Sequence, residues 1–123
     1  MRAMVIDDSR AMRTILGRML KEIGFETCEA ANGRAALEAL KAQGPLDLAL
    51  VDWNMPEMDG YEFVLALRAD HAFDSMRVMM VTTEADLGNV SKALEAGANE
   101  YLMKPFTKEA VSEKLSMLGI EAP

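Results

Sequence analysis

Short apolar runs alternate along the chain with longer stretches in which hydrophobic positions recur at helical spacing. Most of the apolar runs are nearly uninterrupted by polar residues, which is typical of strands that are covered on both faces of a sheet. The runs predict five strands, namely Ala3 to Ile6, Phe25 to Ala30, Leu46 to Val51, Val78 to Val81 and Tyr101 to Met103.

The stretches between the runs have the spacing and the end signals of amphipathic helices. Ser9 can cap the first helix and Gly24 suits a left-handed stop, while Asn32 can cap the second helix and Gly44 with Pro45 ends it. The predicted helices run from about Met12 to Ile23, Gly33 to Ala42, Tyr61 to Arg68, Asp86 to Ala96 and Lys108 to Leu118. In the last three helices, the positions expected to face the core are Phe63, Val64, Leu67, Val90, Leu94, Val111, Leu115 and Leu118.

Strict alternation of strands and helices predicts an α/β fold with a parallel sheet and helices on both faces. Five units are too few for a closed eight-stranded barrel, so we expect an open, doubly wound sheet. In the strand order 2-1-3-4-5, which is common in such sheets, the first and third strands are neighbours.

Composition narrows the class of protein. A chain of 123 residues is expected to form one domain, residues 1–123. The net charge of -7 disfavours direct binding to nucleic acid, because the chain would repel a phosphate backbone. No apolar stretch approaches the roughly 20 residues of a membrane helix, and no signal peptide is evident, so we expect a soluble cytoplasmic protein. The single cysteine excludes an internal disulfide.

The polar residues at the strand ends form the candidate site. The first strand ends in Asp7-Asp8 and the third in Asp52, so three carboxylates should crowd one crevice at the carboxyl edge of the sheet. Their repulsion would be costly without a cation. A ligand set of oxygens alone favours Mg²⁺ or Mn²⁺ over Zn²⁺.

Thr82 and Lys104 follow the fourth and fifth strands and should lie at the same edge. A hydroxyl and a mobile ammonium there could hold the oxygens of a phosphoryl group whose phosphorus faces Asp52. We therefore interpret the constellation as a phosphoryl receptor in which Asp52 is the nucleophile and forms an acyl phosphate.

A calcium loop is the competing reading of DWNMPEMDG, because Asp52 and Asn54 fit its first and third positions. The pattern then requires an oxygen ligand at Pro56, a glycine at Glu57 and a bidentate Glu at Phe63, so it fails. Asp59-Gly60 is better interpreted as a turn and a helix start than as a ligand.

Four motifs in this order resemble the receiver domains of two-component response regulators: VIDDSR, LVDWNMPEMDG, VTTE and YLMKPF. The resemblance covers essentially the whole chain and is greatest to the single-domain chemotaxis regulators of the CheY type. It implies a flavodoxin-like fold, phosphorylation at Asp52 and a cis Lys104-Pro105 bond.

The resemblance also implies roles for individual residues. Mg²⁺ would be held by the Asp8 and Asp52 side chains and the Asn54 backbone carbonyl, with Asp7 acting through water. Thr82 and Lys104 would contact the phosphoryl group. Thr82 would further act with Tyr101 as a switch that reports phosphorylation on the face built by the fourth helix, fifth strand and fifth helix.

The resemblance suggests a histidine kinase of the chemotaxis type as phosphoryl donor and a flagellar motor switch protein as target. The protein itself is expected to be a monomer with no effector domain. A stand-alone phosphate sink and a stress or cell-cycle regulator remain alternatives. Two other classes are a Mg²⁺-dependent aspartyl-phosphate phosphohydrolase, which wants Asp-x-Asp after its first strand, and a flavodoxin-like electron carrier, whose flavin phosphate Asp7 and Asp8 would repel. Thr83 stands where the family often has Ala or Gly and is expected to narrow access to Asp52, while Asn54 and Glu84 lie where the family tunes the access of water.

Overall fold

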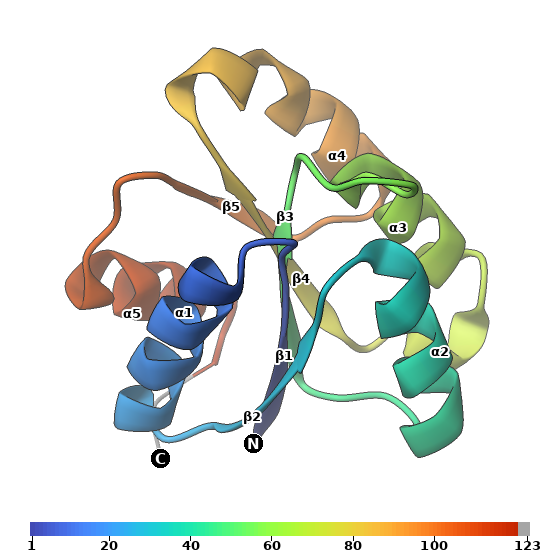
Figure 1. Cartoon of the computed structure of the whole chain (residues 1–123), viewed down its shortest axis with the longest axis horizontal. Helices are drawn as coiled ribbons and strands as arrows, with labels where there is room; N and C mark the ends of the chain where they lie inside the picture. Colours follow the sequence, from blue (N-terminus) through green and yellow to red (C-terminus); the bar gives the residue numbers. More distant parts are fainter. Residues whose placement is uncertain (121–123) are drawn as a thin grey trace.

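The computed structural model describes residues 1–120 and shows a parallel sheet between two layers of helices (Figure 1). The strand order is β2-β1-β3-β4-β5, as predicted. The strands are β1 (Arg2–Ile6), β2 (Glu26–Ala30), β3 (Leu48–Asp52), β4 (Arg77–Thr82) and β5 (Glu100–Met103). The helices are α1 (Arg10–Ile23), α2 (Gly33–Gln43), α3 (Gly60–Arg68), α4 (Val90–Ala96) and α5 (Lys108–Met117), with the short 3₁₀ helices η1 (His71–Phe73) and η2 (Glu84–Asn89).

The predicted caps of α1 and α2 are confirmed by their contacts. The Ser9 side chain accepts a hydrogen bond from the Met12 amide at the start of α1, and Gly24 ends the helix with φ 123°. Asn32 caps α2 in the same way. Asp59 caps α3 in a reciprocal capping box, which confirms its interpretation as a helix start.

Each face of the sheet has its own hydrophobic core. α1 and α5 cover one face, and α2, α3 and α4 cover the other (Figure 1). Successive residues of a strand point to opposite faces, so Val5 packs under α1 and α5 while Ile6 packs on the other side. β3 is buried along its whole length, because it lies at the centre of the sheet.

The fourth helix differs from the prediction in two respects. Its expected first turns form η2, and the α-helix begins only at Val90. Leu94, expected to face the core, has 41% of its surface exposed. Val90 and Ala93 take the inward positions of this short helix, which places Leu94 further round the helix, towards solvent.

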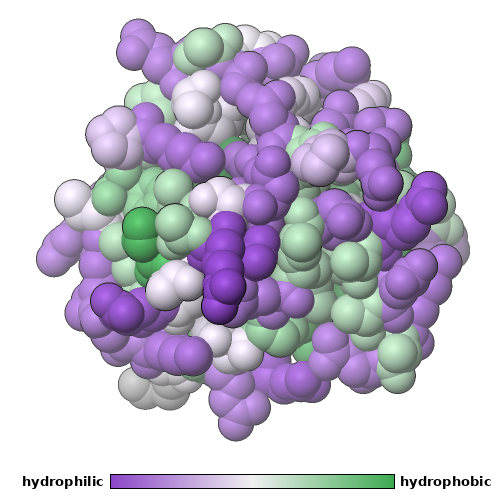
Figure 2. All heavy atoms as spheres, in the orientation of Figure 1, coloured by the Kyte–Doolittle hydropathy of each residue, from purple (hydrophilic) through white to green (hydrophobic). Residues whose placement is uncertain are grey.

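Within the described residues, none of the helices has the length and apolar character needed to cross a bilayer. Hydrophilic residues occupy the centre of the face seen in Figure 2 and are flanked by hydrophobic patches. Pro123, where the sequence analysis places the end of the domain, lies outside the described residues.

Candidate functional site

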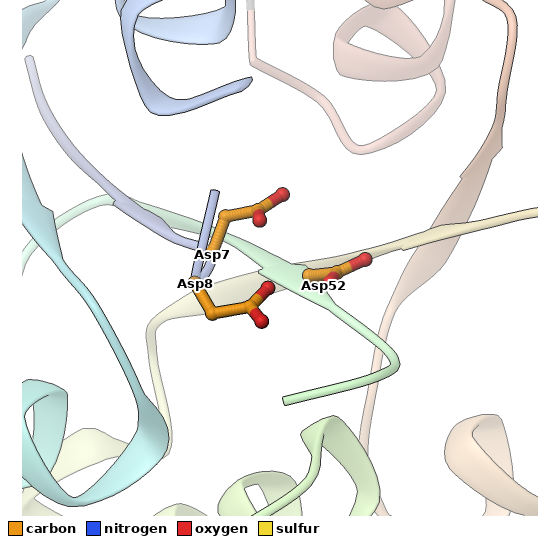
Figure 3. A group of neighbouring side chains, drawn as sticks. All are labelled: Asp7, Asp8 and Asp52. Carbon is orange, nitrogen blue, oxygen red and sulfur yellow. The ribbon is translucent and has the colours of Figure 1, made fainter. Parts of the chain in front are cut away.

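The register of the sheet brings the predicted carboxylates together. Ile6 of β1 pairs with Val51 of β3, so Asp7, which follows β1, and Asp52, the last residue of β3, lie at the same level of the sheet edge. Asp8 points its carboxyl group towards the same space (Figure 3). One carboxylate oxygen from each of the three lies within 4.8 Å of the other two. The predicted convergence of these acids is therefore confirmed.

Asp7 is almost completely buried, and only one of its two carboxylate oxygens accepts a hydrogen bond from the described residues. Its Oδ1 accepts a hydrogen bond from the Ser9 amide at 2.8 Å. Its Oδ2 is buried and has no hydrogen-bond partner among the described residues. Burial raises the pKa of Asp7, and this effect outweighs the Ser9 hydrogen bond and the attraction of Lys104, which lower it. The hydrogen bond from Ser9 and the charge of Lys104 thus do not fully offset the cost of burying the Asp7 carboxylate.

Asp52 ends the central strand and is held by one cation. Lys104 Nζ donates to Asp52 Oδ1 at 3.1 Å. Burial raises the pKa of Asp52, the negative charge of Asp7 raises it further, and Lys104 opposes both. Positive charge near the cluster therefore favours the ionised form of Asp52.

The residues present fit a divalent cation. Among residues 1–120, three carboxylates converge, one buried oxygen lacks a partner, and the Lys104 ammonium reaches Asp52. Oxygen donors without Cys or His are the set that hard cations prefer. The acidic triad, Asp7, Asp8 and Asp52, is consistent with a divalent metal site.

Thr82 and Lys104 lie beside Asp52, as their places at the strand ends predict. Thr82 pairs with Met103 across β4 and β5, and the Lys104 amide donates to the Thr82 carbonyl at 2.7 Å. The Thr82 hydroxyl is buried and donates to the Thr83 carbonyl at 3.3 Å. The Lys104-Pro105 bond is cis, as the resemblance implied. The Lys104 ammonium therefore reaches the acidic triad, whereas the Thr82 hydroxyl is engaged with the Thr83 carbonyl.

Asn54 and Tyr101 lie further out. Asn54 is exposed, and its side-chain amide donates to Asp86 Oδ2 at 2.8 Å. Tyr101 is half-buried in β5, and Lys114 Nζ lies 4.2 Å from the centre of its ring. Tyr101 pairs with Met80 rather than with Thr82. The structure leaves the switch role of Tyr101 and the metal-ligand role of the Asn54 carbonyl as predictions.

Two residues of this region escaped sequence reasoning. Arg13 donates to the Asp7 carbonyl at 2.7 Å and forms an ion pair with Glu29, but an arginine on a helix carries no signal for such a contact. Asp86 accepts a hydrogen bond from the Thr83 hydroxyl at 3.1 Å. The spacing Thr-x-x-Asp is a helix-start signature that could have drawn attention to this pair.

Comparison with known proteins gives consistent results. The sequence model of the family described as "Response regulator receiver domain" matches residues 3–116. The chain is 41% identical over 119 residues to chemotaxis protein CheY1 of Helicobacter pylori (strain J99), covering 96% of each chain. It is 40% identical over 116 residues to a CheY homologue of Campylobacter jejuni, covering 94% of this chain and 89% of the relative. The solved structure of Vibrio cholerae CheY4 superposes with a TM-score of 0.86 at 32% identity, covering 94% and 96% of the two chains.

Proposed function

This chain belongs to the response regulator receiver family, and we propose that it is a phosphorelay regulator which accepts a phosphoryl group on Asp52 from a histidine kinase. A receiver is a phosphoacceptor signalling protein rather than a catalytic enzyme, so the phosphohydrolase alternative is set aside. The observation that carries the proposal is the contact of Lys104 with Asp52 at 3.1 Å inside a cluster of three carboxylates.

In the proposed reaction, a carboxylate oxygen of Asp52 attacks the phosphorus of a phosphohistidine. The P–N bond breaks, its electron pair stays on the departing imidazole, and Asp52 becomes an acyl phosphate. Lys104, which contacts Asp52, and the Thr82 hydroxyl, once turned from the Thr83 carbonyl, would hold phosphoryl oxygens as the charge of the transferred group moves onto Asp52. Hydrolysis of the acyl phosphate by water resets the site.

We propose Mg²⁺ as the resident metal, with Mn²⁺ as a substitute. Asp8, Asp52 and the Asn54 backbone carbonyl would hold it, and Asp7 would act through water. A bound divalent ion would offset the combined negative charge of the carboxylates and the phosphoryl oxygens. The buried, unpartnered Oδ2 of Asp7 supports this proposal, because a metal-bound water would give that oxygen a donor.

The output is proposed to be a population shift of the α4-β5-α5 face. Thr82 would give up its hydrogen bond to the Thr83 carbonyl and turn towards the phosphoryl group. Tyr101 would then move into the space left, against the restraint of Lys114 above its ring. Relatives named as chemotaxis proteins support a role in chemotaxis. The proposed donor is a chemotaxis kinase, the proposed target a flagellar motor switch protein, and the proposed acting form a cytoplasmic monomer. A phosphate sink or another signalling pathway is the alternative.

The test is labelling with the small phosphodonor acetyl phosphate in the presence of Mg²⁺, followed by intact mass spectrometry. We expect one phosphoryl adduct on the parent protein and none on Asp52→Asn. Asp74→Asn, which removes an exposed acid on the loop after η1, is the matched control and should be labelled like the parent. Labelling of Asp52→Asn at the parental level would contradict the assignment of the acceptor.

A further inference from the structure

The carboxylate of Asp86 connects two loops that border the acceptor. Its Oδ2 accepts from Asn54 Nδ2 at 2.8 Å and from Thr83 Oγ1 at 3.1 Å. Asn54 belongs to the loop after β3, two residues beyond Asp52, whereas Thr83 and Asp86 belong to the segment after β4. One oxygen thus holds both loops. We refer to Asn54, Thr83 and Asp86 as the clasp.

The clasp shares a residue with the proposed switch. The Thr83 carbonyl accepts hydrogen bonds from the Thr82 hydroxyl at 3.3 Å and from the Asp86 amide at 3.1 Å. The Thr83 hydroxyl is at the same time committed to the Asp86 carboxylate. Rotation of Thr82 towards a phosphoryl group therefore removes one of the contacts that fix Thr83. The backbone beside Asp52 is held from both sides while the clasp is closed.

These contacts lie at the edge of the sheet at which a reactant must arrive. Lys104 occupies one carboxylate oxygen of Asp52, and the carboxylates of Asp7 and Asp8 lie on the side of β1. The loops after β3 and β4 border the other side, and the clasp is a side-chain bridge between them. A phosphodonor and a hydrolytic water both need the free part of the Asp52 carboxyl group, so both are affected by how readily these loops separate.

We propose that Asp86 is a positioning residue that limits access to Asp52 by holding the clasp closed. This inference rests on the proposed function of Asp52 as phosphoacceptor. Opening of the clasp precedes both loading and hydrolysis, so Asp86 slows the two reactions by the same factor. The steady-state fraction of phosphorylated protein is then affected much less than the rate at which it is reached.

The charge of Asp86 could act differently, and the chemistry separates the two effects. A carboxylate near Asp52 would repel an anionic phosphodonor but would have little effect on attack by neutral water. A charge effect therefore changes loading alone, whereas a clasp changes loading and hydrolysis together. Asp86→Asn removes the charge and keeps a carbonyl oxygen that can accept from Asn54 and Thr83. Asp86→Ala removes both the charge and the acceptor.

The experiment measures the rate constants for loading by acetyl phosphate and for loss of the acyl phosphate, at saturating Mg²⁺. For Asp86→Ala we expect both to rise by roughly tenfold, the lower end of the effect of losing a hydrogen bond to a charged group. Asp86→Asn, which keeps weaker, neutral hydrogen bonds, should give rate constants between those of the parent and Asp86→Ala. Glu95→Ala, which removes an exposed acid from α4, is the matched control and should leave both rate constants at the parental values.

Three results would overturn the proposal. The first is an Asp86→Ala variant with both rate constants at the parental values. The second is faster loading without faster hydrolysis, with Asp86→Asn behaving like Asp86→Ala, which would assign the effect to charge. The third is weaker Mg²⁺ binding by Asp86→Ala with slower loading, measured by Trp53 fluorescence, since this would make the clasp a support of the metal loop.

A second measurement does not depend on phosphorylation. Hydrogen exchange of the unphosphorylated protein should be faster in residues 53–59 and 83–89 of Asp86→Ala than in the parent or in Glu95→Ala. Unchanged exchange would refute the clasp itself. If exchange responds as expected but the parent is never labelled on Asp52, the clasp stands as a structural contact, while the proposed function and the role of Asp86 in it both fail.

Discussion

Replacing Asp7 with asparagine should stabilise the metal-free protein. Oxygens of Asp7, Asp8 and Asp52 lie within 4.8 Å of one another, and Asp7 Oδ2 is buried without a partner among the described residues. Two unit charges at that distance repel by about 3.5 kcal/mol at an effective dielectric of about 20. Because Lys104 offsets part of this repulsion, we expect Asp7→Asn to raise the free energy of unfolding by ~1–3 kcal/mol.

The geometry favours this substitution in two further ways. The side-chain oxygen of the variant can still accept the hydrogen bond that the Ser9 amide donates to Asp7. The new NH₂ group takes the place of the unpartnered Oδ2 and can donate to the neighbouring carboxylates of Asp8 and Asp52. A destabilising like charge is thus exchanged for a donor of nearly the same shape.

The stability of the metal-free protein should also depend on pH through Asp7 and Asp52. Burial raises the pKa of Asp7 and of Asp52 above the value of 3.8 in the unfolded chain, so the native state binds protons more readily than the unfolded state. Stability then falls as the pH rises from the unfolded pKa through the folded pKa, and the loss is complete above it. Asp7→Asn cannot titrate at this position and should lose less stability over that range.

Urea unfolding in EDTA, followed by circular dichroism at pH 5 and pH 7, measures both effects. Glu95→Gln, an exposed acid on α4, is the control and should stay within about 0.5 kcal/mol of the parent at both values. Addition of Mg²⁺ should stabilise the parent more than Asp7→Asn. A variant that is equally or less stable than the parent in EDTA would refute the view that the acidic triad is held together against its own repulsion.

Two further predictions concern contacts around the site. Gly60→Ala should destabilise by about 1–3 kcal/mol, because the new Cβ would lie 2.6 Å from the Asp52 carbonyl oxygen, whereas Gly88→Ala, which meets nothing within 4 Å, should have little effect in the same urea titration. Arg68→Met should cost roughly 2–4 kcal/mol, because the guanidinium donates to carbonyls that include Gly97 and Met76. Arg18→Met, which alters an exposed arginine on α1, is the control. A parental urea midpoint for either test variant would contradict the reasoning.

The fold followed from the sequence because its signals are local. A buried strand needs an apolar run, and a helix end needs a capping side chain or a residue that tolerates positive φ, as at Ser9 and Gly24. The predicted start of the fourth helix was wrong, because a 3₁₀ helix such as η2 and an α-helix have similar spacing signals over one turn. The prediction that Leu94 faces the core was wrong, because the packing of neighbouring elements sets the inward face of a helix of seven residues.

The location of the candidate site could likewise be predicted from local signals, but its side-chain contacts could not. Asp7 and Asp52 could be placed together because the end of a strand fixes where the next side chain emerges. The contacts of Arg13 and Asp86 join different segments of the folded chain, and the periodicity of the sequence does not encode such contacts. The resemblance supplied the cis bond at Pro105, which the spacing of residues cannot supply. Local rules therefore fix the location of the site, and tertiary contacts fix its detailed hydrogen bonding.

A buried acidic side chain at the end of a core strand lowers the stability of the fold, so its presence at Asp52 indicates a functional role. β3 is buried from end to end, and burial favours the neutral form of Asp52, which is a poor nucleophile. Lys104 alone opposes both burial and the charge of Asp7. A divalent cation at the acidic triad would act in the same direction as Lys104 and favour the carboxylate. The residues that make the metal-free site unstable are thus those that would make phosphorylation depend on the metal, so stability and reactivity should respond to Mg²⁺ together.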